Sequence, residues 1–411
     1  MSVLPISEPR SVAESEERSL SLLIVTVIVA GCSIAYELLL AQTLSTLAAN
    51  TVRWYSLAVG FFLISMGIGS MLYHLVPKTL SRIHLLFWVE IGLISVGSVV
   101  VAGVHLAHML FGYLYVRGYD PSAVFVFLFI PMVLSALIGV LSGFELPILM
   151  DLAKGEGEED AQMERTNEVL AADYFGSLVG SIAFPLVLLA YFHIFEIGIV
   201  IASLNFAVAC WIAIYRLWGG SSLRWIFRMA VLVGIFAALT TAFLQRENVK
   251  GFFLKKYYYY LSASDTLETL FAPMPDMPKI TSIQSPYQRI DIVHDPIGSP
   301  DDQVIELYSN KLEENPNFPS NRILFLNGDF QTNTLHEEIY HEWFAHVPII
   351  LRKKVPNRIL VLGGGDGYLL RELVKYDAVE EIVHIDLDPT LVETAQTNPA
   401  LAAANDGSFS H

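Results

Sequence analysis

Long apolar stretches fill most of the first 250 residues of this chain. Seven of them approach the roughly 20 residues that a helix needs to cross a membrane, at residues 20–36, 54–76, 84–111, 122–150, 169–192, 195–216 and 224–244. We therefore expect an α-helical multi-pass membrane bundle of about seven spans over residues 20–246, after a polar tail at residues 1–19. Prolines are expected to kink or end three of the helices, at Pro131, Pro147 and Pro185.

Small residues recur within these stretches, which favours close contact between helix backbones over isolated anchors. They form two groups: Gly60, Gly67, Gly69 and Ser70, and Gly176, Ser177, Gly180 and Ser181.

The pattern changes after residue 246. Lys255 and Lys256 precede four tyrosines, a combination typical of a membrane interface, and a proline-rich stretch follows at residues 271–279, so residues 247–279 are interpreted as an interfacial segment and linker. Alternating residues then predict a small β domain at residues 280–330, with strands at 288–294, 303–309 and 322–326.

Residues 331–411 are expected to form the first half of a Rossmann-like α/β domain of the methyltransferase type. A helix at 334–346 precedes a buried strand at 358–362, which runs into a turn made of Gly363, Gly364, Gly365, Asp366 and Gly367. A helix at 369–376 and a second strand at 381–387 follow, and Asp386 lies 21 residues after Gly365. Glycines let the backbone approach a nucleoside, and an acidic residue at this spacing is placed to bind both ribose hydroxyls.

Composition agrees with a membrane protein, because 54% of residues are hydrophobic and only 16% charged. The acidic charge is concentrated at the C-terminal end, where residues 251–411 hold 12 Lys and Arg against 23 Asp and Glu, a net charge of −11. Such a domain repels nucleic acid and tolerates cations, although an acidic surface without functional meaning fits equally well.

The two cysteines, Cys32 and Cys210, lie in apolar stretches, so neither a disulfide framework nor a cysteine metal site is expected. His341 follows Glu337 and Glu338 on one predicted helix, but its spacing of five from His336 and from His346 departs from the spacing of four in helical zinc sites. We expect no metal.

The distribution of basic residues gives a conflicting orientation. Most of them lie in the N-terminal tail and in the loops after spans two, four and six, at Arg10, Arg18, Lys78, Arg82, Lys154, Arg165, Arg216 and Arg224. The positive-inside rule then puts the N-terminus in the cytoplasm, and seven spans put the C-terminal domain outside. The segment at 84–111 is where a miscounted span is most expected.

Several segments of the C-terminal part resemble the spermidine synthase family in order and spacing. They are Ser285 to Gln288, Asn327 to Gln331, Ile339 to Glu342, His346 to Pro348, Gly363 to Gly367, Leu370 to Glu372 and Asp386 to Asp388. The resemblance covers roughly residues 280–411, and the chain is identified as similar to the membrane-bound members of this polyamine aminopropyltransferase family.

The resemblance implies aminopropyl transfer from decarboxylated S-adenosylmethionine to putrescine or a similar diamine, giving spermidine and methylthioadenosine without a metal or other cofactor. Gln288, Tyr340 and His341 would line the nucleoside and aminopropyl pocket, with Gln331 beside them. Asp366 would attract the aminopropyl ammonium and Asp386 would hold the ribose. We further expect a homo-oligomer in the cell membrane, with its C-terminal domain in the cytosol, where the donor is made.

Two departures from the family pattern stand out. Asn327 replaces the usual aspartate, a change we expect to be tolerated. The family's catalytic aspartate, which accepts the proton of the amine, belongs to the second half of the domain and is expected beyond His411. The chain is therefore interpreted as an inactive fragment of a longer enzyme, or as one that another polypeptide completes.

Two other functions remain open. Acidic residues in or beside the apolar stretches favour a transporter or sensor of polyamines or cations with an inactive synthase-like domain. They are Glu37, Glu90, Glu145, Asp173 and Glu196, of which Glu145, Asp173 and Glu196 are also compatible with membrane interfaces. An S-adenosylmethionine-dependent methyltransferase is the other alternative.

Overall fold

The computed structural model describes residues 9–48, 51–154, 158–217, 222–259, 266–294, 321–334 and 336–410. The chain forms two compact units that divide within helix α10 after Phe253. The predicted strand at 303–309 lies outside the described residues.

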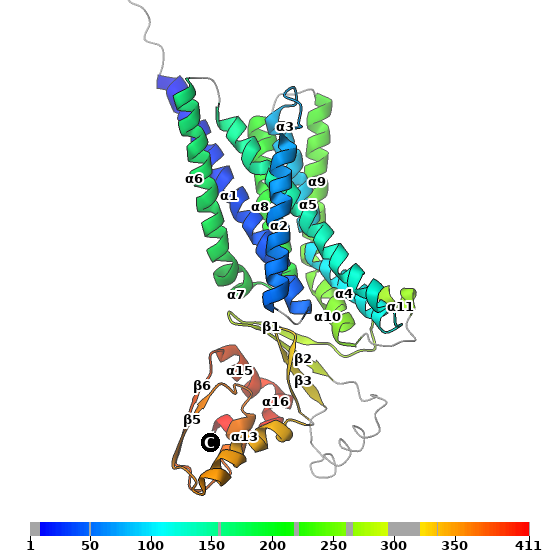
Figure 1. Ribbon diagram of the computed structural model, residues 1–411, viewed down its shortest axis with the longest axis vertical. Coiled ribbons are helices and arrows are strands. Elements are labelled where there is room, and N and C mark those ends of the chain that lie inside the picture. Colours follow the sequence, from blue (N-terminus) through cyan, green and yellow to red (C-terminus); the bar gives the residue numbers. More distant parts are fainter. Residues whose placement is uncertain are drawn as a thin grey trace, which may run out of the picture. The chain divides into compact units, whose positions relative to one another are not determined.

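The first unit is made of helices, and the long ones lie side by side (Figure 1). Their bounds are α1 Pro9–Leu47, α2 Thr51–Tyr73, α3 Arg82–Gly97, α4 Val100–Tyr115, α5 Asp120–Lys154, α6 Glu159–Ala183, α7 Leu189–Tyr191, α8 Ile194–Trp211, α9 Ser222–Leu244 and α10 Arg246–Tyr259. Two π-helical turns, Phe184–Leu188 and Ile212–Arg216, extend α6 and α8.

Six of the described helices are long and apolar enough to cross a membrane: Leu20–Leu47, Val52–Tyr73, Asp120–Lys154, Glu159–Tyr191, Ile194–Tyr215 and Leu223–Leu244. Helices α3 and α4 pass the same test only together, and they are bent by 42° at the break between them. This pair replaces the continuous helix expected at 84–111, and a count of seven requires the pair to act as one span.

Neither Pro131 nor Pro147 ends its helix. Pro131 and Pro147 lie inside α5, which continues past both of them. Pro185 lies in the π-helical turn after α6, where a local change of winding accommodates it.

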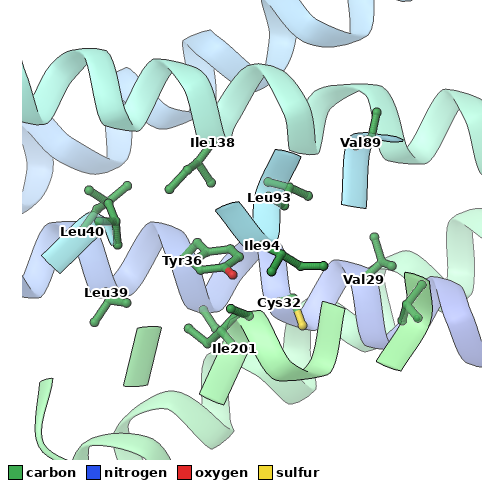
Figure 2. Packing of buried hydrophobic residues seen from close by; sticks show 14 of the residues in the cluster. Val29, Cys32, Tyr36, Leu39, Leu40, Val89, Leu93, Ile94, Ile138 and Ile201 are labelled. Atoms are coloured by element: carbon green, nitrogen blue, oxygen red, sulfur yellow. The ribbon is translucent and has the colours of Figure 1, made fainter. Parts of the chain in front are cut away.

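The core of the first unit gathers around α1. Figure 2 shows Cys32, Tyr36 and Leu39 of α1 among the side chains of Ile94 and Ile201. Tyr36 is fully buried, and a Cβ on Gly97 would overlap its ring, so this glycine makes room for the aromatic side chain.

Glycines also set the closest helix contacts. A Cβ on Gly176 or Gly180 of α6 would overlap the backbone of α1, and one on Gly69 of α2 would overlap the backbone of α5. The expectation of close packing is thus confirmed for these three positions. Gly60 and Gly67 differ, because no atom lies near the place of their missing Cβ.

The second unit begins with the end of α10 and α11 (Leu267–Phe271), followed by an antiparallel sheet in the order β1-β2-β3-β4. Its strands are β1 Thr281–Gln284, β2 Arg289–His294, β3 Arg322–Leu326 and β4 Asp329–Asn333. The sheet is covered on both faces: Ile290 and Ile292 pack with Leu391 and Leu401 of later helices, whereas Val293 packs with Leu254 of α10.

The end of α10 belongs to this sheet through polar contacts as well. The Tyr258 hydroxyl donates to Asp291 at 2.6 Å, and Lys255 donates to the carbonyls of Met274 and Met277. Residues interpreted from sequence as part of a membrane interface therefore have partners inside the C-terminal unit.

A two-stranded parallel sheet follows, with β5 (Arg358–Leu362) beside β6 (Glu381–Ile385). The helices around it are α13 Glu338–Arg352, α14 Tyr368–Leu373, α15 Pro389–Thr397 and α16 Pro399–Ala404, and a 3-10 turn covers Ser408–Ser410 (Figure 1). Helix α13 starts four residues later than the predicted helix, which ended at His346, and it continues past Pro348 to Arg352.

Candidate functional site: the glycine turn after β5

The turn between β5 and α14 needs glycine at several positions. Gly363, Gly364 and Gly367 all have φ near +80°, a backbone conformation that other residues rarely adopt. Gly365 has an ordinary φ, but a Cβ there would lie 2.9 Å from Oδ2 of Asp386. The glycines therefore serve two purposes: they shape the turn, and they let its backbone approach Asp386.

Asp386 lies beside the turn because β5 and β6 are parallel neighbours, whose carboxyl ends meet at one edge. The Gly363 N–H donates to the Ile385 carbonyl at 2.8 Å, which fixes the turn against the end of β6. Oδ1 of Asp386 accepts from the Asp388 N–H at 2.8 Å. Its Oδ2 accepts no hydrogen bond from the part of the chain that the structure describes, so one carboxylate oxygen remains for a ligand.

Asp366 is the acidic residue within the turn, and it is largely buried. Its Oδ1 accepts from the Tyr368 N–H at 3.1 Å, at the start of α14. Its Oδ2 lies 3.9 Å from Nε2 of His341. Burial raises the pKa of the Asp366 carboxyl, although the charge of His341 lowers it in part.

His341 is held from its other side by Glu337, one helical turn earlier. Its Nδ1 lies 2.7 Å from the Glu337 carbonyl and 3.2 Å from Oε2 of the same residue. Burial alone would lower the pKa of His341, but the hydrogen bond to Glu337 and the charge of Asp366 raise it above its ordinary value. The imidazolium is thus favoured between two carboxylates.

An ion-pair network continues from Glu337 and ties α13 to α14. Arg371 bridges Glu337 at 2.6 Å and Glu372 at 2.9 Å, and Glu372 reaches His346 at 3.0 Å. Burial would raise the pKa of Glu372, but hydrogen bonds from Lys375 and Arg371 keep it below its ordinary value. The network positions His341 against Asp366.

The segment around Gln288 reaches the same end of β6 through Asp388. Oδ2 of Asp388 accepts from the Ser285 hydroxyl at 2.7 Å and from Nε2 of Gln288 at 2.9 Å. Its Oδ1 accepts from the Thr390 N–H and so caps α15. Gln288 therefore lies next to the residue that positions Asp386.

The structure gathers most of the predicted site residues. Gly363, Gly364, Gly365, Asp366 and Asp386 form the turn and its edge, His341 contacts Asp366, and Gln288 is joined through Asp388.

The other two side chains are exposed. Tyr340 is 64% exposed, stacks on Phe344 and contacts the ring of His341 edge-on, with ring centroids 5.0 Å apart. Gln331 lies on β4 with a weak contact to the Asp329 carbonyl at 3.5 Å.

Sequence reasoning missed the roles of Glu337, Ser285 and Asp388. Glu337 lies four residues before His341, a spacing that places both on one helix face, but its pairing with Arg371 depends on tertiary contacts. Ser285 and Asp388 are 103 residues apart, and only folding reveals their contact. Among the described residues, no group of three or more His, Cys, Asp or Glu is arranged to hold a metal ion.

The family model and the known proteins that match this chain all point to one family. The spermine/spermidine synthase domain matches residues 337–406. A polyamine aminopropyltransferase of Leptospira interrogans is 29% identical over 390 residues, which are 95% of this chain and 66% of that protein. Polyamine aminopropyltransferase 2 of Ralstonia nicotianae is 30% identical over 403 residues, covering 96% of this chain and 67% of that protein.

A solved spermidine synthase from Thermotoga maritima is 32% identical over a part that covers 31% of this chain and 36% of that chain, with a TM-score of 0.23. The chain spans about two thirds of the length of the curated relatives it matches. Since the similarity to the Ralstonia protein runs through both units, the chain belongs to the polyamine aminopropyltransferase family.

Proposed function

We propose that this chain provides the donor-binding part of an enzyme that transfers an aminopropyl group from decarboxylated S-adenosylmethionine to putrescine or a similar diamine. The observation that carries the proposal is the pair of carboxylates, Asp366 and Asp386, held at a glycine turn that leaves one oxygen of Asp386 free. The adenosine would lie along Gly363, Gly364 and Gly365, with its ribose hydroxyls on Asp386.

Asp366 would then face the aminopropyl ammonium of the donor. A carboxylate suits this position because both substrates are cations and the donor lacks a carboxylate of its own. His341 would orient the Asp366 carboxylate that it contacts. Gln288, which donates to Asp388, would line the same end of the nucleoside pocket. The roles of Gln331 and Tyr340 stay predictions.

The transfer requires only orientation and removal of a proton. The neutral amine of putrescine attacks the aminopropyl carbon next to the sulfonium. The C–N bond forms as the C–S bond breaks, and the electron pair of that bond neutralises the sulfur, giving methylthioadenosine. The new ammonium then loses a proton to a base. The complete step is proposed for the whole protein, and none of the described residues is assigned as that base.

The decisive experiment incubates the full-length protein with decarboxylated S-adenosylmethionine and putrescine. Release of methylthioadenosine and spermidine in equal amounts is expected. A parallel incubation with S-adenosylmethionine tests the methyltransferase alternative, which predicts S-adenosylhomocysteine instead. Absence of methylthioadenosine with every diamine tried would refute the proposal.

We further propose that the helical unit lies in the cell membrane and that the C-terminal unit is cytoplasmic. The length and apolar character of six helices support the first point. The second rests on the donor, which is a cytosolic metabolite. Placing the loop that contains Lys78 in the cytoplasm as well requires that the bent pair α3–α4 enters and leaves the membrane on the same side. Lys154 and Arg165, which follow the next crossing, then lie outside.

Two cysteine variants test this arrangement, since both native cysteines lie within helices. Lys78→Cys and Lys354→Cys place a thiol at exposed positions before the pair and in the C-terminal unit. In inverted membrane vesicles, a membrane-impermeant maleimide should label both variants. Labelling of Lys78→Cys alone would mean that the pair crosses and that the C-terminal unit faces outward.

A further inference from the structure

A cavity of about 220 Å³ lies in the helical unit among α1, α2, α5 and α6. It belongs to a different unit from the glycine turn. Its polar lining consists of two carboxylates and four hydroxyls: Glu145, Asp173, Ser33, Ser70, Ser142 and Ser177. No Lys, Arg or His is among the described residues that line it.

The cavity is framed by backbones that cannot easily close over it. Gly143 of α5 packs against the Met66 backbone of α2, and Gly176 of α6 packs against the Val27 backbone of α1, so each pair is already at its closest approach. Pro147 also lines the cavity, and it has no N–H to donate to the carbonyl of Gly143, another lining residue.

Glu145 is the central group. The residue is only 3% exposed, and its Oε2 accepts from the Ser33 hydroxyl at 2.7 Å. Apart from the carboxyl of the neighbouring, fully buried Glu90, with which it forms a hydrogen-bonded pair, no group in the described part of the chain donates to its Oε1. The structure buries Glu145 inside the helical unit.

The described lining of the cavity carries no positive charge to balance these carboxyls. A buried ion costs several kcal/mol unless a partner compensates it, and Glu145 adjoins a second carboxyl, that of Glu90. Ser142, which also lines the cavity, likewise has a hydroxyl without a partner among the described residues. These groups can all accept hydrogen bonds, so an N–H cation complements them.

The remaining lining favours an organic cation over a metal ion. Ile34, Phe62 and Met66 give the cavity an apolar wall, which suits methylene groups and not the hydration shell of a metal. The volume is several times the roughly 30 Å³ that one water occupies in the liquid. No described cluster of ligands is arranged for a metal.

We propose that this cavity binds a small aliphatic ammonium ion, with Glu145 as its main counter-charge and Asp173 as a second one. The site is separate from the proposed transferase site and does not depend on it. Glu37, which the sequence also indicated for a cation route, is not among the lining residues.

The test measures equilibrium binding of radiolabelled 1,4-diaminobutane to the full chain in lipid nanodiscs. An Asp366→Asn, Asp386→Asn background disables the candidate donor site, so the remaining binding reports on the helical unit. One diamine per chain is expected. Glu145→Gln should weaken binding at least tenfold and Asp173→Asn several-fold, whereas Glu168→Gln, an exposed carboxylate on the same helix as Asp173, should leave it unchanged.

Melting temperatures without amine control for folding. Glu145→Gln removes an uncompensated charge, so it should melt no lower than the background protein. If that variant does not fold, Asp173→Asn, at a less buried position, decides alone. Diamine binding is measured in choline chloride and again in sodium chloride at the same ionic strength. Unchanged affinity in the folded variants overturns the proposal, as does a complete loss of diamine binding in sodium chloride. Failure of the transferase assay leaves this result unaffected.

Discussion

Asp386 combines a fixed position with a free oxygen. The bond from the Asp388 N–H holds Oδ1, and the absence of a side chain on Gly365 leaves room beside Oδ2. A charged acceptor that is already oriented loses little entropy when a ribose binds to it. The residue should therefore contribute directly to nucleoside affinity.

Asp386→Asn tests this contribution. The amide oxygen can still accept from Asp388, but the negative charge is lost, and we expect binding of methylthioadenosine to weaken about tenfold, or ~1.4 kcal/mol. Calorimetric titration measures the change. Asp377→Asn, an exposed carboxylate in the same unit, serves as the matched control and should bind like the native protein.

His341 should make stability depend on pH. Because its pKa in the folded protein is raised above that of an unfolded histidine, about 6.5, protonation stabilises the fold. This contribution is complete below about pH 6.5 and is lost as the pH rises through the folded value. Amide exchange in α13, corrected for its intrinsic pH dependence, should show protection falling over this range.

His341→Gln provides the comparison, because it removes the titrating group and keeps a hydrogen-bonding side chain. Its protection in α13 should vary less with pH than that of the native protein. The same pH dependence in both proteins would assign the effect to another residue.

At the scale of elements, strands with an apolar pattern were predictable, whether or not the structure buries them. Strand β5 was expected to be buried, but of its five residues only Val361 is, and Leu360 and Leu362 are 59% and 73% exposed. The strand prediction at 322–326 matches β3, whose Leu324 is buried. Strand β4 was missed because Asp329 to Gln331 are exposed and the strand lies at a sheet edge, so no alternating apolar pattern marks it. The positive φ angles of Asn327 and Gly328, typical of a tight hairpin, identify it afterwards.

Helix ends were harder to predict because they depend on solvent. Pro348 lies two residues after the predicted helix end at His346 and removes the donor for the Phe344 carbonyl. Phe344 and Pro348 are both exposed, so water can donate to the Phe344 carbonyl. Helix α13 therefore continues until Lys353 adopts a left-handed conformation. In the first unit, the length of the apolar stretches located the helices. The 42° break between α3 and α4 could not be located in this way, because no proline or charged residue marks it.

The glycine contacts between α1 and α6 give a direct test of packing. Gly176→Leu would force α6 away from the Val27 backbone, so we expect a loss of about 1–3 kcal/mol and a lower melting temperature in detergent. Gly60→Leu introduces the same side chain on α2, where no atom lies near the missing Cβ, and it should change stability by less than about 0.5 kcal/mol.

For the whole molecule, the charge of the C-terminal part should influence substrate capture. The net charge of −11 over residues 251–411 attracts a diamine at long range, and salt screens this attraction beyond about 10 Å at 0.1 M. The KM for putrescine should therefore rise several-fold between low and physiological salt, with little change in kcat. Binding of uncharged methylthioadenosine should stay constant; equal salt effects on both ligands would contradict long-range attraction.

The bond between Ser285 and Asp388 bears on how the chain folds during synthesis. Since the two residues are 103 positions apart, the first leaves the ribosome roughly 5 to 20 seconds before the second. Until then the turn at Ser285 lacks its carboxylate, and Ile290 and Ile292 lack the cover of Leu391 and Leu401. During this interval the apolar face of the nascent sheet is uncovered, and such surfaces are prone to wrong association.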